Sequence, residues 1–199
     1  MKILRPNVDR KEVIDFYLES DNVKKNGTIP ADYSTLDWND PNALDCWLRK
    51  HGYKFGIMPG YKEWAYVQLS KDDLMDTVIV SSIFPGSARR LGDLIDTQAL
   101  KEWVPDRDSS KAWYEPLSKG DVPKGCDIIL RHSTKGEGGK YYVEDGSGRS
   151  ICYLRAIHNL HRDSEICGYI GTKPDPSSNF MREKFSKLAL ITSEKIFPD

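Results

Sequence analysis

Residues 140–150, KYYVEDGSGRS, constrain the fold more than any other part of the chain. The first five residues are rich in aromatic and β-branched side chains, which is typical of a strand. Gly146 and Gly148 then allow a sharp backbone turn. An apolar run with helical spacing follows, through Ile151, Leu154 and Ile157. The segment therefore predicts a strand, a tight turn and a helix, in that order.

The rest of the chain alternates between strand-like and helix-like patterns. Residues 127–131 predict a short strand, and the polar residues 132–139 predict the turn that joins it to residues 140–144. Further strands are predicted at 63–69 and 77–84, helices at 10–19, 41–51 and 93–103, and a proline-containing irregular segment at 106–125. Strands with interspersed helices indicate an α+β domain with a mixed sheet and surrounding helices.

Three regions are expected along the chain. Residues 1–60 predict a helical N-terminal extension, and residues 61–171 carry the strands of the core. Residues 172–199 begin with a Pro/Ser linker and continue as an amphipathic helix that we expect to pack on the core.

Composition limits the classes of function. The 199-residue chain has 29 basic and 30 acidic residues and a net charge of −1, so it has no bulk electrostatic attraction to nucleic acid. DNA binding would require local basic residues. No apolar run approaches the roughly 20 residues that span a bilayer, and no secretory signal opens the chain. We therefore expect a cytoplasmic protein.

The glycine turn has the features of an anion-binding site. Gly146 and Gly148 allow a ligand to approach the backbone, and a hydroxyl of Ser147 or Ser150 is suited to cap the helix. The first helical turn presents backbone N–H groups and the positive end of the helix dipole, while Arg149 adds a forked cation. The alternative is an ordinary hairpin turn with a solvated Arg149.

Two carboxylates precede the turn. Glu144 and Asp145 end the predicted strand, where they would suit a Mg²⁺ ion or a general base. Cations beside carboxylates are expected where a nucleotide–metal complex is handled. Glu144, Asp145 and Arg149 are therefore the candidate catalytic residues.

Other polar residues have competing interpretations. A zinc ion could be bound by Cys152, His158, His161 and Cys167. Their spacing fits no known zinc-binding pattern, however, and a buried or structural role is expected instead. His132 is the histidine expected to approach the turn. Trp103 and Trp113 could stack on bases, although tryptophans of such a chain usually pack in the core.

The hairpin, the turn and the apolar helix together resemble the core signature of the ParB/sulfiredoxin-like superfamily. In that family a hairpin strand ends in a Gly-x-x-Arg turn that leads into a helix and holds nucleotide phosphates. Residues 146–149, Gly-Ser-Gly-Arg, match this pattern position by position. The family also places an arginine after an upstream strand, where this chain has Arg89 and Arg90. The resemblance implies a ParB/sulfiredoxin-like mixed sheet and nucleotide-contacting roles for Arg89, Arg90 and Arg131.

Departures from the family pattern narrow the implied function. Sulfiredoxins have a catalytic cysteine in this turn, where the chain has Ser147, so redox chemistry is not expected. Partition proteins have a helix-turn-helix domain after the motif, and too few residues follow here. The chain is more similar to compact stand-alone members, which include nucleases, free-serine kinases and plasmid fertility-inhibition proteins of the oncogenic-suppression type. These are associated with ATP hydrolysis and DNA cleavage.

Three functions remain open. The first is a Mg²⁺-dependent ATP-hydrolysing enzyme with possible DNA-cleaving activity, acting against plasmid conjugation. The second is a non-catalytic module in which a nucleotide regulates binding to a secretion or conjugation protein. The third is a kinase for a free amino acid.

Overall fold

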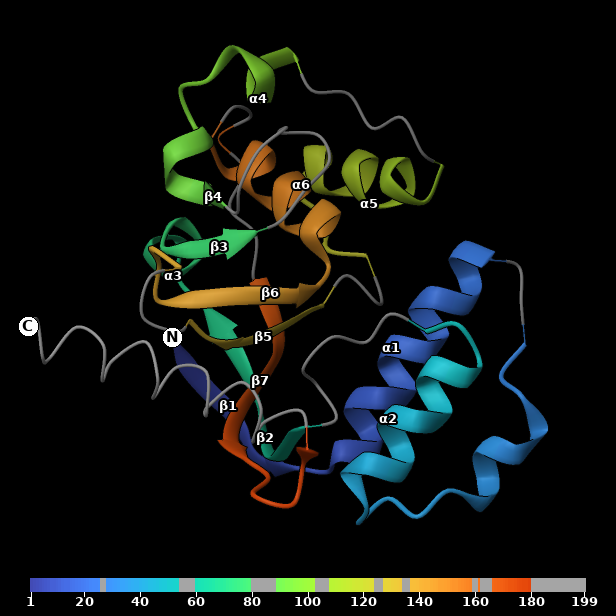
Figure 1. Cartoon of the computed structure of the whole chain (residues 1–199). Coiled ribbons are helices and arrows are strands. Elements are labelled where there is room, and N and C mark those ends of the chain that lie inside the picture. The colour runs from blue at the N-terminus through green and yellow to red at the C-terminus, as the bar shows by residue number, and fades with distance from the viewer. Residues whose placement is uncertain are drawn as a thin grey trace, which may run out of the picture.

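A mixed seven-stranded sheet organises the computed structural model, which describes residues 1–25, 28–53, 60–79, 89–102, 108–123, 127–133, 137–158, 161 and 166–179. Its strands are β1 (Lys2–Val8), β2 (Tyr61–Leu69), β3 (Thr77–Ile79), β4 (Arg89–Arg90), β5 (Ile128–His132), β6 (Tyr141–Asp145) and β7 (Ile166–Pro174). The spatial order is β1-β2-β7-β5-β6-β3-β4 (Figure 1). The β7–β5 and β6–β3 pairs are parallel and the other pairs are antiparallel.

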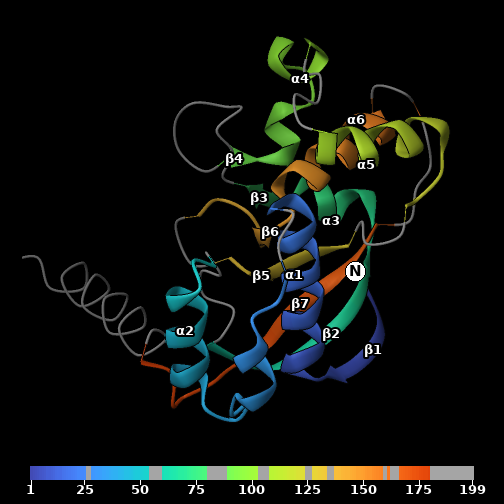
Figure 2. The same ribbon diagram turned by 90° about the vertical axis from the view of Figure 1, so that its right-hand side faces the viewer.

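Helices cover the two faces of this sheet. They are α1 (Arg10–Lys25), α2 (Pro41–Lys50), α3 (Lys71–Met75), α4 (Gln98–Glu102), α5 (Asp108–Lys119) and α6 (Ser147–His158), with the 3₁₀ helices η1 (Ala31–Thr35) and η3 (Leu91–Leu94). Figure 1 shows α1 and α2 side by side, and Figure 2 shows α1 lying along the sheet. The α+β class with a mixed sheet is thus confirmed. Among the described residues, none of the helices combines the length and apolar character that crossing a bilayer requires.

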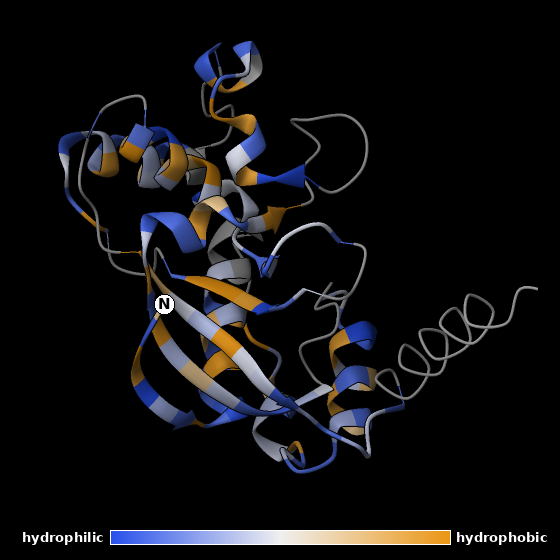
Figure 3. Ribbon diagram, turned by 90° about the vertical axis from the view of Figure 1, so that its left-hand side faces the viewer, coloured by the Kyte–Doolittle hydropathy of each residue, from blue (hydrophilic) through white to orange (hydrophobic). Residues whose placement is uncertain are grey.

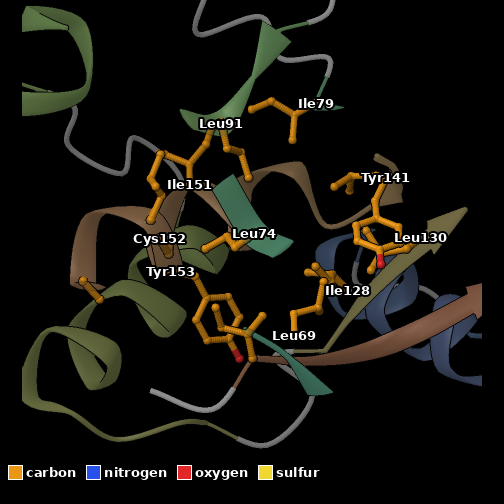
Figure 4. Close-up of a cluster of buried hydrophobic side chains, with 14 of the residues drawn as sticks. Leu69, Leu74, Ile79, Leu91, Ile128, Leu130, Tyr141, Ile151, Cys152 and Tyr153 are labelled. Carbon is orange, nitrogen blue, oxygen red and sulfur yellow. The ribbon is translucent and has the colours of Figure 1, made fainter. Parts of the chain in front are cut away.

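Strand alternation divides the core into two clusters. Along β2, Ala65 and Val67 pack with the residues of α3, α4, α5 and α6, whereas Trp64 packs with α1 and α2. Figure 4 shows the first cluster, in which Ile128 and Tyr153 come from β5 and α6. Strand β5 contributes to both clusters, with Ile128 in the first and Ile129 in the second.

The N-terminal region differs from the predicted helical extension. Residues 2–8 form β1, which pairs with β2 and so belongs to the same sheet. Six of its seven residues are exposed, and only Val8 is buried. No apolar alternation marked this segment, because an edge strand is formed by backbone pairing and tolerates Pro6. Helices α1 and α2 follow at the predicted positions.

Two further segments differ from expectation. Residues 108–119 form α5 although Pro116 lies inside it, because Leu117 is fully buried and Trp113 and Tyr114 pack against the core. The segment expected as a linker from residue 172 still belongs to β7, which ends at Pro174. The predicted C-terminal helix beyond residue 179 lies outside the described residues.

A buried ion pair ties the end of β7 to the helical layer. The Arg10 guanidinium contacts the Asp175 carboxylate at 2.5 Å and donates to the carbonyl oxygens of Tyr61 at 2.9 Å and Trp38 at 3.2 Å. Burial raises the pKa of Asp175, but hydrogen bonds from Ser177 and Arg10 outweigh it and lower the pKa below its ordinary value. Asp175 therefore contributes stability in its charged form.

We expect Asp175→Asn to lower the free energy of unfolding at pH 7 by about 1–3 kcal/mol, because Arg10 loses its charged acceptor. The contribution of Asp175 is complete above the pKa of an unfolded aspartate, about 4, and is lost as the pH falls through the lower folded pKa. Urea denaturation at several pH values should show that the free energy of unfolding of the variant falls less than that of the wild type as the pH is lowered. Asp45→Asn, in an exposed pair with Arg49, is the control. Equal pH dependence of wild type and Asp175→Asn would contradict this assignment.

Candidate functional site

The predicted strand, turn and helix are all present. Strand β6 ends at Asp145, Gly146 adopts φ +98°, and α6 begins at Ser147. A Cβ on Gly146 would lie 2.9 Å from both Arg149 Nε and Ile128 Cγ2. Glycine is thus required here both for the backbone angle and for the space. The alternative of a hairpin turn is excluded, because a helix and not a returning strand follows.

The two serines of the turn are placed differently from each other. Ser147 is the first residue of α6. Ser150 is fully buried, and both its backbone N–H and its hydroxyl donate to the Gly146 carbonyl, at 2.8 and 3.0 Å. Ser150 therefore supports the turn from inside, and Gly146 stands before the first helical residue without a side chain that could cap the helix.

Arg149 is held rigidly in the first turn of α6. Its side chain is 1% exposed and forms an ion pair with Asp145. Its guanidinium carbon lies 5.4 Å from the ring centre of Phe16 in α1 and 5.2 Å from that of Trp113 in α5. Such cation–π contacts are worth about 0.5–2 kcal/mol each and help to hold the guanidinium beside these rings. Trp113 is thus a partner of Arg149 as well as a half-buried packing residue.

Glu144 belongs to a separate cluster of charged residues, with Arg131 and Glu137. Arg131 Nε contacts the Glu144 carboxylate at 2.5 Å, and the two terminal nitrogens of Arg131 contact the Glu137 carboxylate at 2.7 Å each. The guanidinium also stacks at 4.0 Å from the Tyr142 ring centre. Burial lowers the pKa of Arg131, but the two glutamates outweigh this and raise it above the ordinary value. The guanidinium is committed to carboxylates inside the protein.

The two predicted metal-binding carboxylates are engaged separately. Glu144 pairs with Arg131, and Asp145 pairs with Arg149. Within the described ranges, no group of three or more His, Cys, Asp and Glu side chains gathers as for a metal ion. Of the four residues considered for zinc, Cys152 is fully buried in the core of α6.

Arg89 and Arg90 form the short edge strand β4, which is coloured as hydrophilic in Figure 3. Arg90 is paired with Asp93 at 2.8 Å and with Asp76 at 3.6 Å. Strand β3 separates β4 from β6, so these arginines start two strand spacings, about 10 Å, from the strand that leads into the turn. They are exposed on the same sheet, but the structure does not bring them into contact with Arg149.

His132 lies at the wrong end of its strand for the role expected of it. It is exposed and pairs with Tyr141, the first residue of β6, whereas the glycine turn follows the last residue of β6. Because β5 and β6 are antiparallel, His132 lies about 13 Å along the strand from Ile128, beside the turn. His158 is at the far end of α6, where burial and the charge of Lys71 lower its pKa.

Sequence reasoning missed a row of polar residues beside the turn. Tyr66 donates a hydrogen bond to Asp127 at 3.0 Å. The register of β5 with β7 pairs Ile128 with Gly168, which sets Asp127 next to Cys167. Burial raises the pKa of Asp127, against lowering effects of the Tyr66 hydrogen bond and of the charges of Arg149 and Arg5. No local pattern could reveal this row, because its members come from three strands that are distant in sequence.

Neighbouring charges complete the surroundings of this row. Glu12 on α1 forms a hydrogen-bonded pair with Arg5 at 2.7 and 3.2 Å and accepts a 3.0 Å hydrogen bond from Tyr169. The Arg5 guanidinium lies 4.9 Å from the ring centre of Tyr66. This end of the sheet thus combines the glycine turn, the buried Arg149 and several carboxylates that have different hydrogen-bond and ion-pair partners. Comparison of the chain with protein-family models, with curated proteins and with solved structures finds no match.

Proposed function

We propose that the chain binds the phosphates of a nucleotide, ATP in the first instance, at the start of α6 and hydrolyses it. The observation that carries the proposal is Gly146, whose positive φ turns β6 directly into α6 beside the buried Arg149. The first-turn N–H groups and the helix dipole at such a junction favour an anion. The Gly-x-x-Arg pattern of the ParB/sulfiredoxin-like resemblance expects phosphate at the same residues, Gly146 to Arg149.

The residues have different roles in this proposal. Backbone groups of residues 146–149 hold the phosphates, and Arg149, steadied by Asp145, supplies positive charge. Ser150 acts through the shape of the turn because it is fully buried. Mg²⁺ belongs to the substrate: it arrives on the nucleotide with most of its own waters, so it needs at most one or two protein carboxylates. Asp145 is the carboxylate of the expected pair that lies beside the turn.

The biological setting follows from the resemblance to compact stand-alone members of the superfamily. It extends the proposal to DNA cleavage and to inhibition of plasmid conjugation, with a conjugation or secretion protein as partner. With a net charge of −1, contact with DNA would depend on local basic residues, for which the exposed Arg89 and Arg90 of β4 are suited.

A pair of glycine variants tests the site. We expect Gly146→Ala to weaken ATP·Mg²⁺ binding by about tenfold or more, equivalent to about 1.4 kcal/mol, because the new Cβ strains the turn and displaces Arg149. Gly120→Ala is the matched control: Gly120 has φ +91°, but no atom lies within 4 Å of its Cβ position. Both variants bear backbone strain of about 1–3 kcal/mol, and only Gly146→Ala should lose the nucleotide. Calorimetric titration and phosphate release measure the two effects.

The outcomes separate the three open functions. ATP·Mg²⁺ binding with phosphate release supports the hydrolase. Saturable binding without turnover supports the interaction module, and release that requires a free amino acid supports the kinase. A wild-type protein that binds no nucleotide would refute all three functions. Equal nucleotide binding by the two glycine variants would refute the proposed site.

A further inference from the structure

Asp127 differs from the other carboxylates near the turn in the kind of partner that it has. Within the described part of the chain, its hydrogen bond comes from the neutral hydroxyl of Tyr66, at 3.0 Å. Asp145 is paired with Arg149, Glu12 with Arg5 and Glu144 with Arg131. An arginine-paired carboxylate is a weak base, because the charge of its partner opposes protonation. Asp127 is the carboxylate least restrained in this way.

Asp127 also flanks the turn itself. It directly precedes Ile128, whose Cγ2 would lie 2.9 Å from a Cβ on Gly146. The charge of Arg149, in the first turn of α6, acts on the Asp127 carboxylate. Asp127 is half-buried, and its carboxylate accepts the Tyr66 hydrogen bond.

The charged and titratable groups around Asp127 favour a role in proton transfer. Arg149 and Arg5 supply positive charge, and Tyr66 and the neighbouring Cys167 complete the row. Burial outweighs the lowering effects of Tyr66 and the two arginines and raises the pKa of Asp127 above its ordinary value. A carboxylate becomes a better general base as its pKa moves toward the working pH.

We infer that Asp127 is the general base of the nucleotide hydrolysis proposed above, with Tyr66 as its positioning residue. The inference rests on the proposed function. One water proton passes to the Asp127 carboxylate as the water oxygen bonds to the terminal phosphorus. The bond from phosphorus to the bridging oxygen breaks, and the nucleoside diphosphate leaves with the electron pair. Asp127 then returns its proton to solvent, and inorganic phosphate is the second product.

Asp127→Asn tests this role, because the amide keeps the size and the acceptor for Tyr66 but cannot take the proton. We expect binding of ATP·Mg²⁺ to stay within about threefold of wild type, while kcat falls by about 10²–10⁴-fold and the acid limb of its pH profile disappears. Glu12→Gln is the matched control. It removes one charge beside the same row, and its carboxyl likewise accepts a tyrosine hydroxyl, yet it should keep turnover and an acid limb in the pH profile.

Tyr66→Phe tests the positioning role. The Tyr66 hydrogen bond lowers the pKa of Asp127, so its removal should raise that pKa and move the acid limb to higher pH. If the proteins bind nucleotide, two results would overturn the inference: turnover by Asp127→Asn at the wild-type rate, or an acid limb of the pH profile that does not move in Tyr66→Phe. If the wild type binds no nucleotide, the proposed function and this inference are both overturned.

Discussion

Arg149→Met is expected to lower the free energy of unfolding by about 3–5 kcal/mol and to abolish nucleotide binding. The side chain is 1% exposed, so its removal leaves the Asp145 carboxylate in a largely buried place without the guanidinium that neutralises it. The contacts with Phe16 and Trp113 are lost as well. Urea denaturation measures the first effect, and titration with ATP·Mg²⁺ measures the second.

Arg49→Met is a closely matched control. Asp45 and Arg49 have the same i,i+4 spacing as Asp145 and Arg149, but both lie in α2 and Arg49 is 64% exposed. An exposed pair of this kind contributes about 0.3–0.5 kcal/mol, so its loss should be small. The double variant Asp145→Leu with Arg149→Met removes the unpaired carboxylate and should recover much of the stability while binding stays lost. Nucleotide binding by that double variant would contradict the proposed role of the Arg149 charge.

Local signals predicted the part of the fold that holds the turn. The strand at residues 141–145, Gly146 and the helix after it were each marked by residues within a few positions of one another. The helix begins three residues earlier than the apolar run suggested, because Ser147 and Gly148 carry the first turn without contributing to the apolar stripe. The strand β2 and the start of β3 were foreseen on the same grounds.

Pairing between distant segments was not predictable in this way. Strand β1 exists because its backbone pairs with β2, and α5 persists around Pro116 because Leu117 is buried against the core. Asp127 acquires its hydrogen bond only when β2 lies near β5, with β7 between them. Each of these depends on tertiary contacts that override local propensity.

The separation of Glu144 from Asp145 was partly within reach of sequence reasoning. The part of the separation that could be foreseen is the alternation of side chains along the predicted strand. The shift in register between β5 and β6 at Ile129 and Leu130, opposite Asp145 and Val143, could not be foreseen. The same alternation brings Arg131 and Glu144 to one face, since the register pairs Arg131 with Tyr142, two residues before Glu144.

The cluster of Arg131 with Glu137 and Glu144 yields the second large effect. Arg131→Met is expected to destabilise the fold by about 3–5 kcal/mol, because the buried Glu144 carboxylate and the partly buried Glu137 carboxylate lose the cation that they share. The loss should be measured by urea denaturation at pH 7. Partial recovery is expected in Arg131→Met with Glu144→Gln, where the more buried of the two carboxylates is neutral.

Nucleotide titration of the same variant separates a structural arginine from a phosphate-binding one. The Arg131 side chain is 3% exposed, and its guanidinium is satisfied by Glu137, Glu144 and the His132 carbonyl. Contact with a phosphate would require breaking these contacts. At a temperature where Arg131→Met remains folded, it should therefore bind ATP·Mg²⁺ as the wild type does, in contrast to the Arg149 variants. Loss of binding by folded Arg131→Met would instead assign Arg131 to the nucleotide site, in agreement with the family resemblance.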